Sequence, residues 1–464
     1  MATRTDILLL GATGFAGRLI AHYLATHPQR SYFSLGLAAR SLPKLRAIVQ
    51  ELGAAGQDIR QVELDVTDPA SLDRAIKSTR VVINTVGPFW TWGTPVVRAC
   101  VKNNVHYVDI TGEVSWIKQI LTEFDFVATK TRTVIVPACG YDSIPSDISA
   151  HLAHKALLEY VTTNYPGAQF EGLNTSISAH KLGNAIVSGG TIASFLTALE
   201  EVPYELAKES QNPFVLSPFK RTPLPFPQLV YNLPVPNSQT IKGSMFVMRN
   251  SNAAIVHRTA GLLDLHAREV RHSALGRPDP KLENARYGST FVYDEFLVNS
   301  STISSIVTSV TLIVGFLILK VFTPIRTLAK SFLPGPGTGP SNEEMDKGYL
   351  HLTNISTAAP SPSYPPLKVK SEIKVNGDPG YRLTAAMISE SALSLLLPPP
   401  SASPEVKKTY NPFSALPPMA KQGGILTPMT AFGDVLIQRL RDSGHFEFNA
   451  VVFDESNNVD RKQI

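Results

Sequence analysis

Short apolar runs alternate with helical stretches over the first third of the chain. The runs typical of strands are 6–10, 34–39, 60–64, 81–85, 107–110 and 133–136. Between them apolar residues recur at helical spacing, as Val96, Val97 and Cys100 do. Strands that alternate with helices form βαβ units with parallel strands. Residues 1–150 are therefore predicted to form an α/β domain built on a doubly wound parallel sheet.

The hydropathy pattern changes after Ser149. The ranges 151–296 and 346–464 are predicted to be two parts of a second, α+β domain, because strand-like alternation returns after residue 346. Between them, Leu297 to Leu319 contains no charged residue and has the length of a membrane-competent helix. A Pro/Gly run follows it, so we expect a hydrophobic helix at 297–322 and a linker at 323–345.

A glycine-rich turn stands between the first strand and the first helix. Gly11, Gly14 and Gly17 have the spacing Gly-x-x-Gly-x-x-Gly. Glycine permits a tight turn and lets a pyrophosphate approach the N–H groups at a helix amino terminus, where the helix dipole favours anions. Because further βα units follow, the motif predicts a Rossmann dinucleotide site, and a structural turn is the alternative. Thr13 and Phe15 lie inside the motif and are expected to contact the cofactor.

The end of the second strand indicates which dinucleotide binds. A site for NAD has Asp or Glu there, whereas this chain has Arg40 and Ser41, with Lys44 one helical turn later. These side chains suit a 2′-phosphate and predict NADP(H), the alternative being a solvated basic helix start. Asp65, after the third strand, is a candidate acceptor for the adenine amino group, and a helix cap is the alternative.

Further candidates stand at the ends of later strands, where open α/β sheets bind ligands. Thr85, Gly87 and Pro88 are expected to contact the cofactor. The aromatic residues at 89–92 are expected to flank the nicotinamide or the substrate entrance, and packing in the core or an interface is the alternative for them. The candidates for catalysis at strand ends are Tyr107, Glu113, Tyr141 and Asp142. The range 188–191 is expected to be a turn with a helix cap, with an anion-binding nest as the alternative.

Composition narrows the partners and the compartment. The net charge is +5, without a dense Lys/Arg run interleaved with aromatic residues, so nucleic acid is not expected. The two cysteines cannot form a disulfide framework and have no metal-ligand spacing, which favours a reducing compartment. His151 and His154 have helical spacing but no third ligand nearby, so no metal site is predicted. The amino terminus lacks a signal-peptide pattern, so we expect the first domain in the cytosol. The basic and histidine positions of 257–272 are expected to form a solvated helical face, with head-group contact as the alternative.

These motifs resemble those of the saccharopine dehydrogenase-like oxidoreductases, a family that includes the trans-acting enoyl reductases of bacterial lipid biosynthesis. The resemblance rests on the segments 11–17, 84–88, 106–113, 138–147, 377–381 and 423–428. It implies an NADP-type Rossmann domain joined to a second domain, and an oxidoreductase activity. The charge-free segment before the Pro/Gly run also resembles the family. The family name does not identify a substrate.

Three functions are compatible with these residues. The first is an NADP(H)-dependent reductase acting on an enoyl, imine or carbonyl group of a hydrophobic, lipid- or polyketide-like substrate. The range 182–198 favours it, because it offers no charged residue to hold substrate carboxylates. The proton donor is expected to be Tyr141 or Tyr107, oriented by Asp142 or Glu113. The alternatives are a non-catalytic NADP(H)-binding protein of a membrane or lipid surface, and a saccharopine-type amino-acid dehydrogenase.

The hydrophobic segment is expected at a membrane or lipid surface. Asp294 and Glu295 precede it, and the basic residues Lys320, Arg326 and Lys330 follow, an asymmetry that favours a cytosolic carboxyl-terminal flank. A true span would then separate two parts of one enzyme. We therefore expect a helix that inserts into one leaflet, or into a lipid monolayer, from the cytosolic face of an endomembrane or lipid droplet. The alternative is a helix buried in the second domain or in a homodimer interface.

Overall fold

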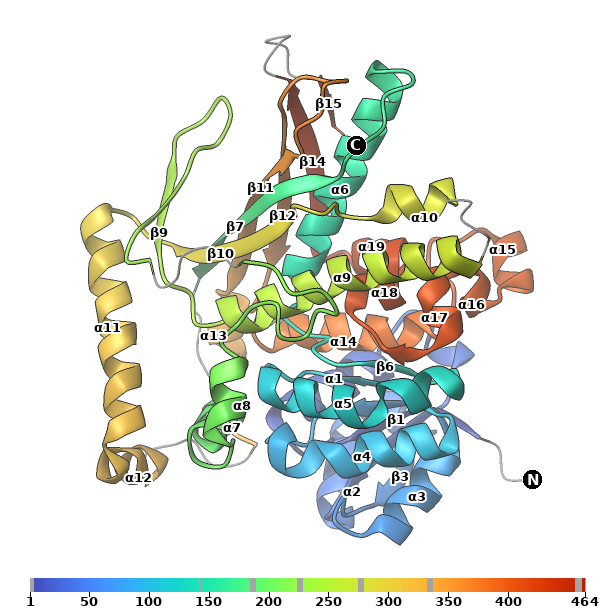
Figure 1. Ribbon diagram of the computed structural model, residues 1–464. Helices are drawn as coiled ribbons and strands as arrows, with labels where there is room; N and C mark the ends of the chain where they lie inside the picture. The colour runs from blue at the N-terminus through green and yellow to red at the C-terminus, as the bar shows by residue number, and fades with distance from the viewer. Residues whose placement is uncertain are drawn as a thin grey trace.

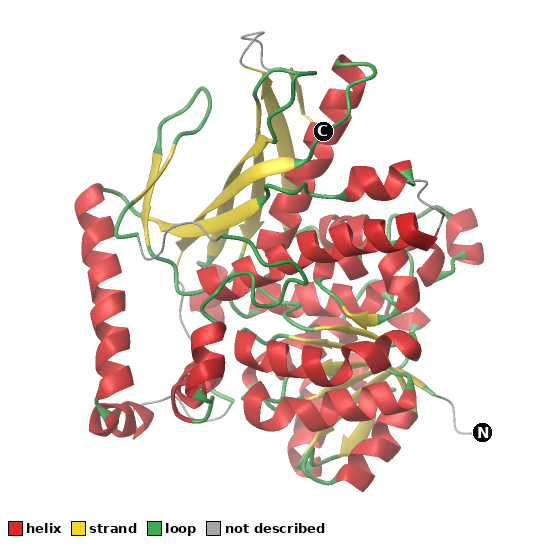
Figure 2. Ribbon diagram, in the orientation of Figure 1, coloured by secondary structure: helices red, strands yellow, loops and turns green. Residues whose placement is uncertain are grey.

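Two β-sheets organise the chain, and Figure 1 places one in the upper and one in the lower part of the molecule. The computed structural model describes residues 4–141, 143–183, 189–222, 228–273, 279–331, 337–454 and 461–463. Figure 2 shows helices around the lower sheet and between it and the upper one. The expected α/β class with a second domain is confirmed.

The lower sheet is parallel throughout and has the order β13-β6-β5-β4-β1-β2-β3. Its strands are β1 (Thr5–Leu10), β2 (Leu35–Ala39), β3 (Arg60–Glu63), β4 (Thr79–Asn84), β5 (His106–Asp109), β6 (Val134–Val136) and β13 (Gly424–Ile425). The strand order reverses between β1 and β4, which is where doubly wound sheets bind dinucleotides.

Helices cover both faces of this sheet, and the side chains of β1 explain why. Ile7 and Leu9 pack on one face, with α1 (Phe15–Ala25) and α2 (Leu42–Glu51). Leu8 and Leu10 pack on the other face, with α3 (Pro69–Lys77), α4 (Phe89–Asn103) and α5 (Val114–Lys130). A strand buried on both faces is a continuous apolar run, which is what the sequence has at this position.

The carboxyl-terminal part of the chain returns to the lower sheet. Strand β13 pairs with β6 as the seventh strand, and α14 (Arg382–Ser394) packs against both α1 and α19 (Gly433–Asp442). The sequence analysis had assigned all of 346–464 to the second domain. The structure differs because the face of the sheet beside α1 is apolar and α14 covers it.

The upper sheet has eight strands in the order β15-β14-β12-β11-β7-β10-β9-β8. They are β7 (Leu173–Gly183), β8 (Tyr231–Leu233), β9 (Ile241–Ser244), β10 (Val292–Val298), β11 (Tyr349–Ala358), β12 (Leu367–Asn376), β14 (Phe446–Asp454) and β15 (Arg461–Gln463). Strands β7 and β10 are parallel, and the other pairs are antiparallel. Helices α6 (Ile144–Asn164) and α9 (Arg249–Ser273) pack against it and against each other.

The remaining helices are shorter or lie at the periphery. They are α7 (Gly189–Glu200), α8 (Tyr204–Glu209), α10 (Pro280–Ala285), α11 (Thr302–Val321), α12 (Thr323–Ser331), α13 (Asn342–Asp346), α15 (Pro404–Thr409), α16 (Pro412–Ala415), α17 (Pro418–Gln422) and α18 (Pro428–Ala431), with the short 3-10 turns Arg30–Tyr32 and Gly53–Gly56. Helix α12 lies inside the range 323–345 that is expected to be a linker, and α13 begins inside it.

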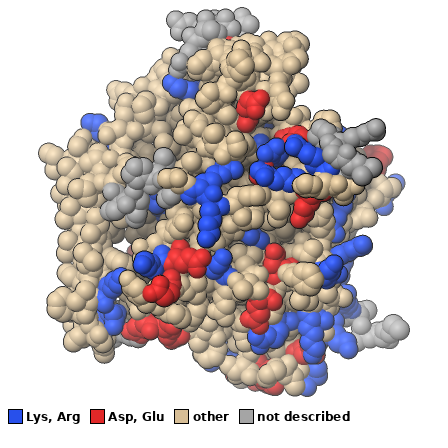
Figure 3. All heavy atoms as spheres, in the orientation of Figure 1, with Lys and Arg blue, Asp and Glu red and all other residues tan. Residues whose placement is uncertain are grey.

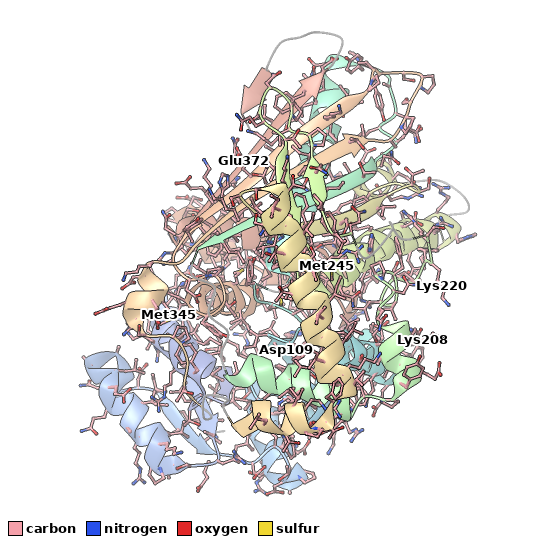
Figure 4. The ribbon with its side chains drawn as sticks, turned by 90° about the vertical axis from the view of Figure 1, so that its left-hand side faces the viewer. Asp109, Lys208, Lys220, Met245, Met345 and Glu372 are labelled. Carbon is pink, nitrogen blue, oxygen red and sulfur yellow. The ribbon has the colours of Figure 1, made fainter. Side chains whose placement is uncertain are left out.

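Helix α11 stands at the edge of the molecule. It has 20 residues, and its most apolar stretch has a mean hydropathy of 2.2. Only 11% of that stretch is buried. Its Ser309 hydroxyl accepts from the Met245 N–H, so Met245 lies against the helix (Figure 4). Figure 3 shows few charged side chains along this edge, on the left of the view. An apolar helix thus leaves most of its surface outside the protein core.

The beginning of the expected hydrophobic helix is different in the structure. Residues 297 and 298 belong to β10, and the helix begins only after Ser301, whose hydroxyl accepts from the Ser304 N–H. Asp294 and Glu295 are buried in β10, where Asp294 pairs with Arg249 at 2.5 Å. They are not charges that flank a membrane helix, so they give no information on its orientation, and the expected cytosolic carboxyl-terminal flank stays a prediction.

The solvated basic face expected at 257–272 is wrong for its first residues. His257 is buried and stacks on Phe214 with ring centroids 3.8 Å apart. The Arg258 guanidinium is buried and donates to the carbonyl oxygens of Leu216 and Ile425. The charge of Arg258 therefore joins α9 to β13, because buried carbonyl groups need donors.

Candidate functional site

The glycine-rich turn leaves no room for side chains. Gly11 has a φ of 79°, and a Cβ there would lie 2.6 Å from the Thr85 Oγ1 atom. A Cβ on Gly17 would lie 2.2 Å from the Gly11 carbonyl oxygen. The turn thereby holds the end of β1 directly against the start of α1 and beside Thr85, as predicted for a phosphate-binding turn.

The start of α1 fits an anion. The N-cap residue is Gly14, no side chain caps the helix, and no acidic residue lies in its first turn. The first N–H groups of a helix have no partner within the helix and carry its positive dipole end. Phe15 begins the helix, and the Phe15 ring lies where a side chain on Gly339 would stand, 2.6 Å from that Cβ position. The segment before α13 therefore passes over the turn.

The adenosine half of the site lies at the ends of β2 and β3. Arg40 and Lys44 are exposed, and Ser41 is the N-cap of α2 without making a side-chain cap bond. The carboxylate of Asp65 accepts from the N–H and hydroxyl of Thr67 at 2.9 and 2.8 Å. These two hydrogen bonds, and the nearby Arg40 charge, lower the Asp65 pKa. The donors present suit a 2′-phosphate, and no carboxylate stands at the end of β2 itself.

The other half of the cofactor site lies after β4. Thr85 donates from its hydroxyl to the Leu10 carbonyl oxygen, and the Gly87-Pro88 peptide bond is cis. Gly87 is exposed, and a Cβ there would lie 3.7 Å from the Ser194 Oγ atom of α7. Helix α7 therefore stands next to the edge where the nicotinamide end of a dinucleotide lies in this fold.

Glu113 has a structural task at the same edge. Its two carboxylate oxygens accept from the N–H groups of Phe89 and Trp90, at 2.8 and 2.7 Å. It therefore caps the start of α4. Burial raises the pKa of Glu113. Both carboxylate oxygens are thus engaged at the start of α4, and the expectation that Glu113 orients the proton donor stays a prediction.

Tyr107 and Asp109 lie in the interior. The Tyr107 side chain is fully buried on the α4 and α5 face of the sheet, and its hydroxyl accepts from Asn84 at 3.1 Å. Asp109 ends β5 and accepts from the N–H groups of Thr111 and Ala138. Burial raises the Asp109 pKa to about 7. The location of Tyr107 beneath the sheet favours Tyr141 over Tyr107 as the site tyrosine.

Tyr141 follows β6 and reaches the upper sheet. Its hydroxyl lies 3.1 Å from Nδ1 of His180 on β7, and Nε2 of His180 lies 3.2 Å from Oε2 of Glu295 on β10. All three side chains are buried. Tyr141 is thus connected to a histidine and a carboxylate that the sequence analysis did not select. Asp142 lies outside the described residues.

Glu295 is held from several directions. Its Oε2 atom accepts from the hydroxyls of Ser146 and Tyr293, each at 2.7 Å, and its Oε1 atom accepts from Asn252 at 2.6 Å. Burial raises the pKa of Glu295, but His180 and these donors outweigh it, so the pKa is lowered. Two adjacent carboxylates, Asp294 and Glu295, inside the otherwise apolar β10 were the signal that sequence reasoning could have used.

One predicted segment is only partly described. Residue 188 lies outside the described residues, and α7 begins at Gly189. Farther along this helix, Ser194 hydrogen-bonds Glu113, and Phe195 packs on Phe316 of α11 with ring centroids 6.1 Å apart. Helix α7 therefore lies between the nicotinamide edge of the cofactor site and the apolar helix α11.

Comparisons with known proteins agree with this geometry. Residues 7–135 match the family model described as Saccharopine dehydrogenase NADP binding domain. A Mycobacterium tuberculosis protein, provisionally named a trans-acting enoyl reductase, is 30% identical over 454 residues, covering 95% of this chain and 96% of that protein. A trans-acting enoyl reductase of Mycobacterium ulcerans is 28% identical, with the same coverage. Apo saccharopine dehydrogenase (L-Glu forming) from Saccharomyces cerevisiae matches 97% of this chain and 100% of that one, with a TM-score of 0.48 and 13% identity.

Proposed function

The chain belongs to the saccharopine dehydrogenase-like oxidoreductase family, with an NADP-binding domain, and we propose that it reduces a hydrophobic substrate with NADPH. The reacting group is an enoyl, imine or carbonyl group. The relatives named trans-acting enoyl reductase support the enoyl group. Bound NADPH supplies the hydride, and the protein binds and orients both reactants and provides a proton.

The observation that carries the proposal is the position of α7. This helix stands beside Gly87 at the nicotinamide edge, and the range 182–198 around its start has no charged residue. An enzyme that forms or splits saccharopine must hold several carboxylates, which normally requires Arg or Lys. The absence of charged residues from this range favours an apolar acceptor over an amino-acid substrate.

The test is NADPH oxidation by the purified full-length chain. Enoyl thioesters, hydrophobic ketones and hydrophobic imines are the acceptors, and saccharopine with NADP is the comparison. We expect turnover with at least one apolar acceptor class and none with saccharopine. Tight NADPH binding without turnover on any acceptor would instead support a non-catalytic NADP(H)-binding protein. Oxidation of saccharopine would support the amino-acid dehydrogenase.

We also propose that α11 docks the protein on a membrane or lipid-monolayer surface from the cytosolic side. Its mean hydropathy of 2.2 and its exposed apolar side chains support this partner, because exposing such an apolar helix to water is unfavourable in free energy. Strand β10 precedes the helix and β11 follows it, and both pair with β7 in one sheet. This pairing supports insertion without crossing.

Docking through α11 explains how an apolar substrate reaches the site. The helix contacts α7 through the Phe195 and Phe316 rings, and α7 continues to Ser194 beside Gly87. A substrate that leaves the lipid surface would therefore pass the Phe316 and Phe195 rings before it meets the cofactor edge at Gly87. A homodimer that covers α11 is the competing explanation for its exposed surface.

A further inference from the structure

We propose that Tyr141, His180 and Glu295 form a proton relay that serves the reduction, an inference that rests on the proposed function. Tyr141 is the catalytic residue of the relay and gives its hydroxyl proton to the substrate. His180 and Glu295 are positioning residues that act through Tyr141. The contacts that carry the proposal are Tyr141 Oη to His180 Nδ1 at 3.1 Å and His180 Nε2 to Glu295 Oε2 at 3.2 Å.

The hydrogen bonds determine which nitrogen of His180 carries a proton. Glu295 is held as a carboxylate by Ser146, Tyr293 and Asn252. A carboxylate accepts only, so the Nε2 atom of His180 donates to it. In neutral His180 the Nδ1 atom is then an acceptor for the Tyr141 hydroxyl. In the imidazolium, both ring nitrogens donate, and the Tyr141 hydroxyl proton is directed to another acceptor.

The position of Tyr141 distinguishes this cluster from an ordinary buried network. Tyr141 stands beyond the carboxyl end of β6, the edge at which open parallel sheets bind ligands. Its backbone N–H donates to the Thr384 hydroxyl of α14, which fixes the loop from the lower sheet. The relay therefore runs from the ligand edge of the lower sheet into the interior of the upper one.

Few charged groups compete for the His180 ring. Among the described residues, its polar contacts are Tyr141, from the loop after β6, and Glu295, from β10. The Phe246 ring lies against it, with centroids 4.9 Å apart, and its backbone partner on β11 is Leu352. The two ring nitrogens of His180 are therefore held by one tyrosine and one carboxylate.

The proposed step balances in atoms and electrons. Bound NADPH would supply the acceptor carbon with a hydride and both its electrons, and negative charge would then develop on the adjacent carbon, oxygen or nitrogen. The Tyr141 O–H bond breaks as its proton forms the new bond there. The N–H bond at Nδ1 of the His180 imidazolium then breaks to restore the Tyr141 hydroxyl. Neutral His180 remains beside Glu295 until a proton from water restores the imidazolium.

The decisive variant is Tyr141→Phe, which removes only the hydroxyl. We expect kcat to fall by about 100-fold or more, the range in which general acids contribute, while NADPH affinity stays the same. His180→Gln is expected to lower kcat and to leave the KM of the acceptor and the NADPH affinity unchanged. A histidine with a structural role alone would change kcat, KM and NADPH affinity together.

The control is Tyr23→Phe, because the Tyr23 hydroxyl also donates to a buried glutamate, Glu390, at 2.6 Å. This variant loses a comparable hydrogen bond away from Tyr141, and we expect it to keep the wild-type rate. A similar loss of rate in Tyr23→Phe would mean that reduced stability alone explains Tyr141→Phe, and would overturn the relay.

A second readout does not depend on turnover. In protein labelled with ¹⁵N at histidine, His180→Gln identifies the two ring resonances of His180. Tyr141→Phe should shift the Nδ1 resonance, and Tyr23→Phe should not. Unshifted resonances in Tyr141→Phe would overturn the relay. If the wild-type chain turns over none of the acceptors, the proposed function is contradicted, and the relay with it. If Tyr141→Phe keeps the wild-type turnover, the relay alone is contradicted.

Discussion

At the scale of single residues, the nucleotide preference depends on the side chains at the end of β2. Arg40 and Lys44 are exposed there, and their charges remain available to a ligand. A guanidinium binds a phosphate with charge-assisted hydrogen bonds, whereas its interaction with an uncharged ribose hydroxyl is much weaker. The preference for NADPH over NADH is therefore expected to reside largely in one side chain.

Arg40→Asp should weaken NADPH binding by about 1 to 3 kcal/mol, because charge-assisted contacts are lost and a carboxylate faces the 2′-phosphate. NADH binding should change much less. Calorimetric titration with both nucleotides measures the two affinities. Arg46→Asp is the matched control, because Arg46 is exposed on α2, the helix that follows Arg40. An unchanged ratio of NADPH to NADH affinity in Arg40→Asp would refute this role.

Asp109 should make the stability of the protein depend on pH. Burial raises its pKa to about 7 in the folded chain, against about 4 for an exposed aspartate. Between these values the folded state binds a proton that the unfolded state has released, so this group lowers stability as pH rises from about 4 to about 7. Above pH 7 its effect is constant.

Asp109→Asn removes this titration. The melting temperature of the wild-type chain should fall between about pH 4 and pH 7 by more than that of Asp109→Asn. Thermal melts followed by circular dichroism at several pH values measure the difference. Asp58→Asn is the control, because Asp58 is exposed and pairs with Arg30 at the surface. Parallel curves for wild type and Asp109→Asn would show that Asp109 is ionised throughout.

Residues at strand ends were predictable, and their partners from distant elements were not. Tyr141 could be selected because it follows a parallel strand, where ligands bind. His180 lies in β7, 39 positions later, and nothing in its local pattern separates it from an ordinary strand residue. Only the pairing of the upper sheet places β7 and β10 side by side, with His180 within reach of Glu295.

At the scale of elements, the lower sheet was predictable because each strand is a short apolar run between helices. Strand β13 was not, since it has two residues and pairs with β6 from the far end of the chain. The start of α11 was misplaced because the charge-free segment contains the end of a strand and a helix. The Ser301 and Ser304 capping box marks the true boundary between them.

The exposed face of α11 should govern lipid binding. Val314 and Leu317 are 46% and 50% exposed, and changing both to Glu places charges on that face. We expect the full-length wild-type chain to float with phospholipid vesicles, and the double variant to remain with soluble protein, because carboxylates resist burial among acyl chains.

The matched control for this experiment is Phe126→Glu, since Phe126 is 73% exposed on α5, away from α11. It should float like the wild type. Equal flotation of the double variant would show that the protein is anchored elsewhere. A wild-type chain that stays soluble as a dimer, and a double variant that is monomeric, would assign the face to a homodimer interface instead.

At the scale of the whole molecule, the nucleotide domain is completed by the carboxyl-terminal part of the chain. Glu390 of α14 accepts from Tyr23 and from Arg439 of α19, at 2.6 and 2.7 Å, and contacts His27 at 2.9 Å. Glu390 and Arg439 are fully or almost fully buried. A domain boundary near residue 150, as the sequence pattern suggested, misses this connection because the residues that make it lie more than 360 positions apart.

Glu390→Ala should therefore destabilise the nucleotide domain, although residue 390 lies outside 1–150. Removing one partner of a buried ion pair costs about 3 to 5 kcal/mol, because the Arg439 charge stays buried without its carboxylate. The three tryptophans, Trp90, Trp92 and Trp116, all lie in α4 and α5, so tryptophan fluorescence reports on this domain alone. The melting transition seen by fluorescence should move to lower temperature together with the one seen by circular dichroism.

Glu405→Ala on α15 is the control, because Glu405 is exposed, and it should move neither transition. A fluorescence transition that stays in place while the circular dichroism transition moves would mean that residues 1–150 fold independently of the rest of the chain.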